Sequence, residues 1–152
     1  MKRTRFADDI CPIARTTDLM GDWWTPLVMR EFLVGPRKFD QLQERLGVSR
    51  ATLSQRLDRL VSEQLLEPRQ YQDNPPRSEY VLTPRGLAFW NVLAAMWQFG
   101  EDWLFGDAGP KIALKDRESG RRVRVKVVDA DTGEPINMHS LRTGRAPCAD
   151  VL

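Results

Sequence analysis

The sequence predicts a mainly α-helical fold with a small amount of β structure, which is the α+β class. Apolar residues recur at helical spacing through most of the chain up to residue 104. Two short strand-like segments flank a turn that contains Pro75-Pro76. The length of 152 residues suits one domain with a small appendage. We therefore expect a domain over residues 1–104 and a linker with a small β appendage and a tail over residues 105–152.

The composition is typical of a soluble globular protein, with 41% hydrophobic and 29% charged residues. No apolar run approaches the roughly 18 residues of a membrane-spanning helix. The amino-terminal residues lack the apolar segment of a secretory signal, so we expect a cytoplasmic protein without membrane association. The two cysteines, Cys11 and Cys148, lie near opposite ends and cannot form a disulfide framework.

Four helices are expected in the first 63 residues. Capping residues or prolines mark their starts, and glycines mark most of their ends. Proline in a first turn is compatible with a helix because that position needs no backbone donor. The expected helices begin at Cys11-Pro12 and end by Gly21, then run over about Trp23–Val34, Phe39–Leu46 and Arg50–Glu63.

The last two of these helices are joined by Leu46-Gly47-Val48-Ser49, a linker that is typical of a helix-turn-helix. Gly47 permits the sharp turn and Ser49 can cap the next helix. Strand-like segments at Leu66–Tyr71 and Ser78–Leu82 follow and predict a hairpin, or wing. The sequence therefore predicts a winged helix-turn-helix domain.

A longer helix is expected over Arg85–Leu104, after the capping pair Thr83-Pro84. Its apolar residues form two stripes, which the small domain cannot cover alone. A partner subunit would provide the missing cover. The two stripes are Leu87, Trp90, Leu93, Ala94 and Trp97, and Phe89, Val92, Met96, Phe99 and Trp103.

The appendage is predicted from strict alternation. Val123, Val125 and Val127 alternate with basic residues, a pattern typical of a half-buried strand with one basic face. Turns are expected at Ser119-Gly120 and Thr132-Gly133. We expect a hairpin or three-stranded appendage over residues 111–141.

The helix that follows Ser49 has side chains suited to DNA. If its leucines are buried, its polar residues face outward, and arginine can read guanine, glutamine adenine and threonine a thymine methyl or a phosphate. A solvated helix face is the alternative interpretation. The candidates for base readout are Arg50, Thr52, Ser54 and Gln55, and Arg56 and Arg59 are candidates for phosphate contacts.

Further candidates for DNA contacts lie outside that helix. The stretch from Arg37 to Arg59 holds six basic and three acidic residues. Arg37 and Lys38 precede the supporting helix and can meet backbone phosphates. Arg77 follows the hairpin turn and can enter a narrow minor groove or meet a phosphate, or it can remain an ordinary surface arginine.

Residues 11–104 resemble the HxlR-type family of winged helix-turn-helix transcription regulators of bacteria, which are relatives of the MarR group. The resemblance is carried by CPIA, GDWWTPLVMREFLVGPRKFDQL, LGVSRATLSQRLDRL and PPRSEYVLTPRG, in this order. It implies a homodimer built through the terminal helices, with two recognition helices about one DNA turn (~34 Å) apart on a pseudo-palindromic operator. Trp23, Ala51 and Asp58 depart from the residues common in the family.

Two hypotheses concern regulation. Cys11 precedes Pro12 at a helix amino terminus, where partial positive charge favours the thiolate, and the resemblance implies oxidant sensing at this position. A quiet thiol is the alternative, and Cys148 is either a resolving thiol or a bystander. The five tryptophans could line a pocket for a small-molecule effector, although core packing is the ordinary role of such residues.

No constellation typical of an enzyme is found in the sequence. It lacks a glycine-rich phosphate loop and a nucleophile elbow, and its one histidine, His139, removes the usual base of a nucleophilic triad. We expect no cofactor and no metal site, because one histidine and two distant thiols do not provide four ligands. A winged-helix module for protein interaction, which needs no basic face, is the alternative to a DNA-binding protein.

Overall fold

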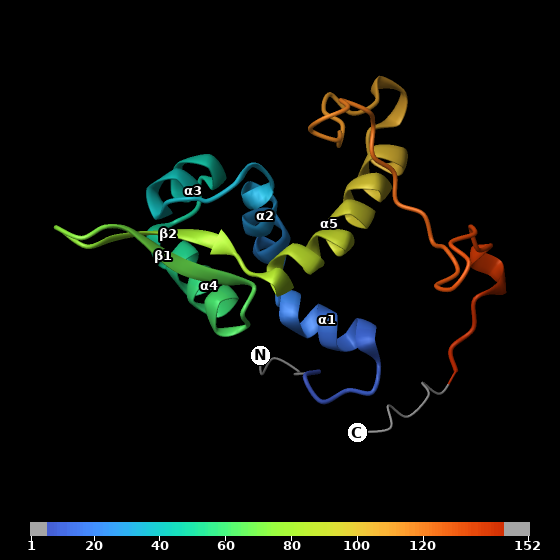
Figure 1. Cartoon of the computed structure of the whole chain (residues 1–152), viewed down its shortest axis with the longest axis horizontal. Coiled ribbons are helices and arrows are strands. Elements are labelled where there is room, and N and C mark those ends of the chain that lie inside the picture. Colours follow the sequence, from blue (N-terminus) through green and yellow to red (C-terminus); the bar gives the residue numbers. More distant parts are fainter. Residues whose placement is uncertain (1–5, 145–152) are drawn as a thin grey trace. The chain divides into compact units, whose positions relative to one another are not determined.

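The computed structural model describes residues 6–144, which divide into two compact units (Figure 1). The first unit ends at Leu93 and the second begins at Ala94. This division falls inside the helix α5, Pro84–Trp103. The helix expected to close the first domain therefore contributes residues to both units.

The first unit contains the expected helices. They are α1 (Pro12–Met20), α2 (Trp24–Arg30) with a 3-10 continuation over Glu31–Val34, α3 (Phe39–Leu46) and α4 (Arg50–Ser62). Asp22 caps α2, because its Oδ1 accepts the backbone N–H groups of Trp24 at 3.0 Å and Thr25 at 3.3 Å. Gly35 ends the 3-10 turn at φ 115, a conformation that glycine adopts without strain.

The helix-turn-helix connection is confirmed. Gly47 ends α3 in the left-handed conformation, with φ 62 and ψ 24. Ser49 caps α4, since its Oγ accepts the backbone N–H of Thr52 at 3.2 Å. Val48, between them, is buried in the core. The turn is thus specified by one glycine, one apolar side chain and one capping hydroxyl.

The wing is a two-stranded antiparallel hairpin of β1 (Leu66–Gln72) and β2 (Arg77–Leu82). Leu66 lies opposite Leu82, and the register is irregular between Gln70 and Gln72 near the tip. The segment before α3 joins the hairpin, because Arg37 and Tyr80 exchange two backbone hydrogen bonds of 3.0 and 2.7 Å. The start of α3 is thereby tied to the wing.

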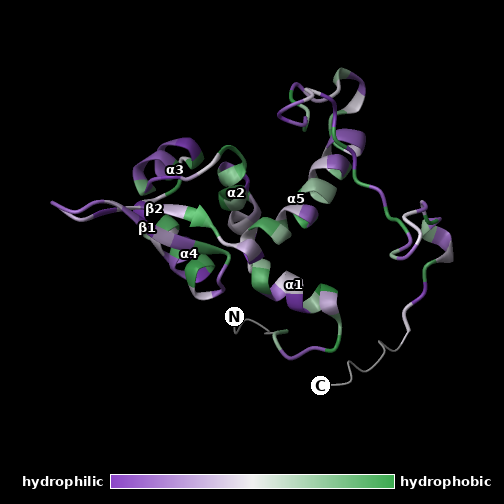
Figure 2. Cartoon of the chain, in the orientation of Figure 1, coloured by the Kyte–Doolittle hydropathy of each residue, from purple (hydrophilic) through white to green (hydrophobic). Residues whose placement is uncertain are grey.

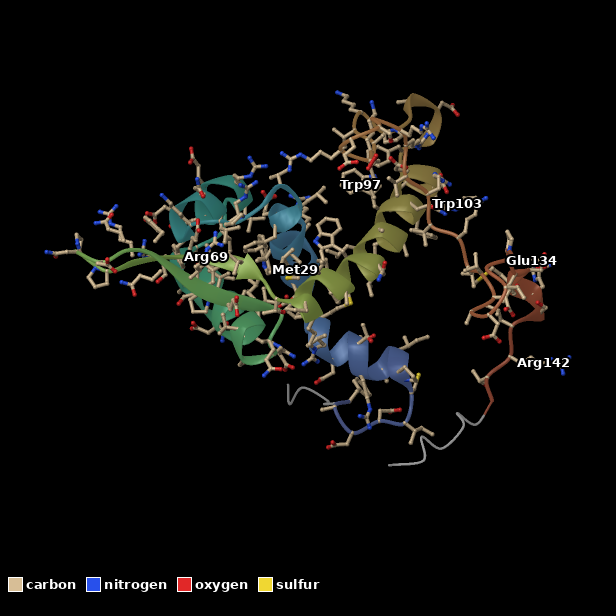
Figure 3. All side chains as sticks on the ribbon, viewed as in Figure 1. Met29, Arg69, Trp97, Trp103, Glu134 and Arg142 are labelled. Atoms are coloured by element: carbon tan, nitrogen blue, oxygen red, sulfur yellow. The ribbon has the colours of Figure 1, made fainter. Side chains whose placement is uncertain are left out.

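The core of the first unit lies between the helices and the base of the wing. Met29 of α2, labelled in Figure 3, is wholly buried. Figure 2 shows apolar residues on α2 and on the first part of α5, whereas α3 is largely hydrophilic. The buried apolar side chains are Val28, Met29, Phe32, Leu42, Val48, Leu53, Leu57, Leu60, Leu65, Leu66, Phe89 and Leu93.

The first turn of α5 packs directly on the polypeptide backbone at the root of the wing. The hydroxyl of Thr83 donates to the carbonyl of Gln64 at 2.5 Å and accepts the N–H of Gly86 at 3.0 Å. A Cβ placed on Gly86 would lie 2.0 Å from the carbonyl oxygen of Leu65. Only glycine therefore permits this approach.

The prediction of a regular strand in the second unit was wrong. Residues 111–141 contain two isolated bridges, Lys115 with Arg122 and Val128 with Pro135, and no regular strand. Backbone pairing is limited to a few bonds beside each turn, such as Val123 N–H to the Leu114 carbonyl at 2.8 Å and Ile136 N–H to the Val127 carbonyl at 3.0 Å. Between these bonds the segment is attached to α5. Arg122 pairs with Glu101 at 2.9 Å, and the backbone N–H of Val125 donates to the amide oxygen of Gln98 at 2.6 Å.

The two bridges enclose turns of the same sequence pattern. Each turn has an aspartate followed three residues later by serine or threonine and then glycine, as in Asp116, Ser119 and Gly120. Ser119 donates its hydroxyl and its backbone N–H to Asp116, and these bonds lower the pKa of that carboxyl. Asp129 accepts the backbone N–H of Thr132 in the second turn. The expected turns are thus present without the expected strand.

The close approach at Gly86 predicts a large difference between two glycines of α5. Gly86→Ala should lower the free energy of unfolding by ~1–3 kcal/mol, because the new methyl group overlaps the Leu65 carbonyl. Gly100→Ala is the matched control, since a Cβ there meets no atom within 4 Å and alanine favours a helix. Urea unfolding measures both. Equal stability of the two variants would contradict the packing described.

Acid should break the ion pair between Glu101 of α5 and Arg122 of the irregular segment. Arg122 lowers the pKa of Glu101 below its ordinary value of 4.5. The contribution of this ion pair is therefore complete above that value and is lost as the pH falls through the lower pKa of the folded protein. The indole of Trp97 donates to Glu101 at 2.9 Å, so its fluorescence reports the change.

The measurement is tryptophan emission between about pH 7 and about pH 2, the range in which carboxylates titrate. Glu101→Gln should remove the step that wild type shows, whereas Asp107→Asn, an exposed neighbour, should retain it. Identical titrations of wild type and Glu101→Gln would contradict the assignment.

Candidate nucleic-acid interface

The helix α4 has one buried apolar side and one exposed polar side. Leu53 and Leu57 are 0% exposed and Leu60 is 2% exposed. Arg50, Ser54 and Gln55 are exposed on the other side. Burial of the leucines therefore determines which side chains of α4 are available to a partner.

Arg50 extends from the first turn of α4 and contacts the first turn of α3. Its guanidinium lies 4.7 Å from the centre of the Phe39 ring. Its Nη1 lies 3.6 Å from Oδ1 of Asp40. The Arg50 side chain is nevertheless 73% exposed. It is held in place and remains accessible.

The other predicted readout residues differ in how free they are. The hydroxyls of Thr52 and Ser49 lie 2.9 Å apart, so the Thr52 hydroxyl belongs to the capping arrangement of α4. Ser54 and Gln55 are exposed, and no side-chain hydrogen bond is found for either within residues 6–144. Ser54 and Gln55 can thus bind a partner without breaking a hydrogen bond within these residues.

Arg56 and Arg59 make contacts within the chain. Arg56 pairs with Asp22 at 2.5 Å, and both side chains are only 21% exposed. Arg59 donates to the backbone carbonyl of Asp18, near the end of α1, at 2.5 Å. Helix carboxyl termini attract cations, which explains this contact. The two arginines attach α4 to α1 and to the start of α2, rather than joining the exposed face.

Arg37, Lys38 and Arg77 lie along the wing and at its junction with α3. Arg37 is half-buried and donates from Nε to the backbone carbonyl of Glu31 at 2.9 Å. Lys38 is exposed, and its ammonium lies 4.1 Å from the centre of the Tyr71 ring. Arg77 begins β2 beside the hairpin tip and is exposed. The hairpin tip projects away from the helices of this unit (Figure 1).

A buried acid, which sequence reasoning missed, positions α3. Glu31 accepts from Arg45 of α3 at 2.5 Å and from Arg30 at 3.3 Å, and its side chain is 7% exposed. The hydrogen bond that Arg45 donates to Glu31 raises the pKa of Arg45. A charged residue at the end of an apolar helix is the one signal in the sequence that could have indicated a buried partner.

Cys11 lies where the sequence predicts. It is the exposed residue that precedes the first turn of α1, followed by Pro12. Its backbone N–H donates to Oδ1 of Asp9 at 2.8 Å. Cys148 lies outside the described residues.

The tryptophans have different surroundings. Trp24 and Trp90 pack against the core of the first unit, whereas Trp23 and Trp103 are 76% and 74% exposed. Trp97 lines a cavity of about 190 Å³ in the second unit. The other lining residues of this cavity are Met96, Gly100, Glu101, Phe105, Pro110 and Ile112.

Two features are absent from residues 6–144. No cluster of three or more histidine, cysteine, aspartate or glutamate residues that could hold a metal ion occurs there. In the same residues, no helix combines the length and the apolar character needed to cross a membrane.

The helix-turn-helix, the hairpin behind it and the exposed face of α4 together define a winged helix-turn-helix protein. The model of the HxlR-like helix-turn-helix family matches residues 19–107. The chain belongs to this family. The resemblance stated from the sequence motifs is thereby confirmed.

Three known proteins are similar to this chain in sequence or in structure. An uncharacterized HTH-type transcriptional regulator of Mycobacterium tuberculosis is 33% identical over 135 residues, which cover 89% of this chain and 85% of the relative. The crystal structure of PA1607, a proposed transcription factor, has a TM-score of 0.84 at 32% identity and covers 93% of this chain and 99% of that chain. The reduced form of the transcriptional regulator YodB from Bacillus subtilis has a TM-score of 0.55 at 25% identity, covering 66% and 99%.

The contact between Arg56 and Asp22 predicts a loss of stability in an Arg56→Ala variant. The loss should be ~1–2 kcal/mol, because Asp22 is left without its partner at a site largely shielded from water. Arg77→Ala, which removes an exposed arginine, is the control and should unfold like wild type.

Thermal and urea unfolding of the two variants provide the measurement. An Arg56→Ala variant that unfolds like wild type but binds DNA more weakly would instead support the phosphate contact expected from the sequence.

Proposed function

We propose that the protein is a transcription regulator that binds operator DNA sequence-specifically through α4. The observation that carries this proposal is the exposed polar face of α4, held in a helix-turn-helix whose apolar face is fully buried. Membership of the HxlR-like helix-turn-helix family supports it. So does the naming of the Mycobacterium tuberculosis relative as an HTH-type transcriptional regulator.

The side chains divide into three roles in this proposal. Arg50, Thr52, Ser54 and Gln55 face base edges in the major groove, because residues near the amino end of a recognition helix enter it most deeply. Arg37, Lys38 and Arg77 contact phosphates or the minor groove. Arg56 and Arg59 position α4 from within the protein.

We further propose that the regulator acts as a homodimer on a pseudo-palindromic operator. Met96, Phe99 and Trp103 follow at spacings of three and four residues, so they share one face of α5. They are 46%, 60% and 74% exposed, and such a cluster of large apolar side chains favours burial against another subunit. In an isologous contact, this face of α5 in one copy would cover the same face of α5 in the other copy.

Regulation is proposed at two places. Oxidation of the exposed Cys11 thiol would alter the start of α1, and YodB has been solved both reduced and after diamide treatment. A small apolar effector could instead occupy the cavity beside Gly100 and Trp97, which has room for about one aromatic ring. Either event must favour one dimer geometry over the other to change the affinity for DNA.

A winged-helix module that binds another protein is the alternative function. It would bury the apolar face of α4 equally well but would not need arginine and glutamine on the exposed face. Binding to DNA depends steeply on salt because counterions are released from the phosphates. Salt-insensitive behaviour, with no enrichment of any DNA sequence, would favour the protein-interaction alternative.

Selection of bound sequences from a random pool of DNA duplexes tests the proposal. Wild type should enrich an inverted repeat with half-sites about one helical turn (~34 Å) apart. Arg50→Ala should cost ~1–3 kcal/mol at one base pair of each half-site, because a bidentate contact to guanine is lost. Arg117→Ala, an exposed residue of the second unit, is the control with the same change in charge.

Two readouts separate the parts of the proposal. Sedimentation of the free protein should give the mass of a dimer. When the selection is repeated with diamide-treated protein, wild type should show reduced enrichment, whereas the Cys11→Ser variant should keep its enrichment. An equal loss by Arg50→Ala on every sequence would assign Arg50 to a phosphate. Failure of wild type to enrich any sequence would refute DNA recognition itself.

A further inference from the structure

The segment 37–40, which leads into the first turn of α3, contacts both the wing and the recognition helix. Arg37 pairs through its backbone with Tyr80 of β2, and Lys38 stacks over Tyr71 of β1. The two following residues, Phe39 and Asp40, contact Arg50 of α4. Four consecutive residues therefore connect the hairpin to the side chain at the start of α4.

We infer that Phe39 and Asp40 are positioning residues that set the base specificity of Arg50 without contacting DNA themselves. This inference rests on the proposed function, in which Arg50 reads a base edge. It adds a claim that the proposed function does not contain, namely that the specificity of α4 is partly determined by α3.

The geometry restrains the Arg50 guanidinium without using its hydrogen-bond donors. The Arg50 guanidinium carbon lies over the Phe39 ring, 4.7 Å from its centre, and an aromatic ring takes up none of the strong hydrogen-bond donors of the guanidinium. The separation of 3.6 Å between Arg50 and Asp40 is that of an ion pair, longer than a hydrogen bond. The donors thus remain available for the two acceptors that guanine presents in the major groove.

Restraint matters because arginine is long and flexible. A free arginine side chain loses rotamer entropy when it binds, and an arginine already held in its bound position loses less. A freely rotating guanidinium can also reach a neighbouring base or a phosphate, so restraint favours one base pair over the others.

The charge of Asp40 supports the same conclusion. An exposed carboxylate beside a DNA-binding surface is repelled by the phosphates and lowers affinity for every sequence. Asp40 lies in the first turn of α3, where a carboxylate also interacts favourably with the helix dipole. That interaction does not require Arg50, whereas the 87% exposed carboxylate lies 3.6 Å from the Arg50 guanidinium, so orientation of Arg50 is a second role of this charge.

The first turn of α3, which carries Phe39 and Asp40, is itself fixed. The backbone N–H of Lys38 donates to Oε1 of Gln41 at 3.0 Å, which closes the first turn of α3. Leu42 of the same helix is 0% exposed. Phe39 and Asp40 therefore have little freedom to follow a moving Arg50.

The test measures affinity for single-base-pair variants of the duplex that wild type selects from a random pool. The full-length proteins are wild type, Arg50→Ala, Asp40→Asn, Phe39→Leu and the double variant Asp40→Asn/Arg50→Ala. Glu44→Gln is the matched control, because it removes the same charge from an exposed site on the same helix. Unfolding midpoints confirm that each variant is folded.

Asp40→Asn and Phe39→Leu should each reduce discrimination at the Arg50 base pair by about two- to fivefold, the range of exposed ion pairs and cation–π contacts. Discrimination at other base pairs should not change, and Glu44→Gln should reduce it nowhere. In the Arg50→Ala background, Asp40→Asn should have no further effect on discrimination at that base pair, because Asp40 acts on it through Arg50.

The outcomes separate this inference from the proposed function. If Arg50→Ala abolishes discrimination at one base pair while Asp40→Asn and Phe39→Leu retain it, the positioning role is wrong and DNA reading by Arg50 stands. If Asp40→Asn raises affinity equally for all duplexes, Asp40 is only a repelling charge and the inference is overturned. If wild type discriminates between no duplexes, both the proposed function and the inference fail.

Discussion

Burial of the leucine stripe on α4 is the constraint on which the rest of the first unit depends. Leu53, Leu57 and Leu60 are withdrawn from water, and each such side chain contributes roughly 1.5–3 kcal/mol when fully buried. With this stripe facing inward, the helix can rotate very little about its own axis. The polar residues between the leucines must then face solvent.

Electrostatic contacts refine the position that apolar burial selects. Arg56 and Arg59 attach α4 to α1 and the start of α2, and Glu31 attaches α3 through Arg45. These contacts are directional, whereas apolar burial alone allows small displacements along the helix axis. Together they give the turn between α3 and α4 a defined geometry, which a surface that matches the grooves of a duplex requires.

Much of the first unit could be predicted from the sequence because its signals are local. Gly47 and Ser49 specify the turn and the start of α4 within a few residues, and helical spacing of leucines identifies the buried side. The contacts that Arg56 and Arg59 make within the chain could not be predicted in this way. Their partners, Asp22 and the carbonyl of Asp18, are distant in the sequence and become neighbours only in the folded chain.

The second unit shows the opposite case. Alternation of valine with arginine is typical of a strand, yet a strand also needs a neighbouring strand to accept its backbone hydrogen bonds. Here Arg122 and Arg124 find carboxylates on α5, and Val125 bonds to a side chain of the same helix. A periodic pattern in the sequence does not indicate which partner satisfies it.

The contact between Gly86 and the Leu65 carbonyl has a consequence for signalling along the chain. Two backbones in direct contact leave no flexible side chain between them that could absorb a displacement. A rotation or shift of the first turn of α5 must therefore move the residues that join α4 to β1. An effector that bends this helix at its base would therefore displace the connection between α4 and β1 through this rigid contact, in addition to the side chains that α5 places in the core.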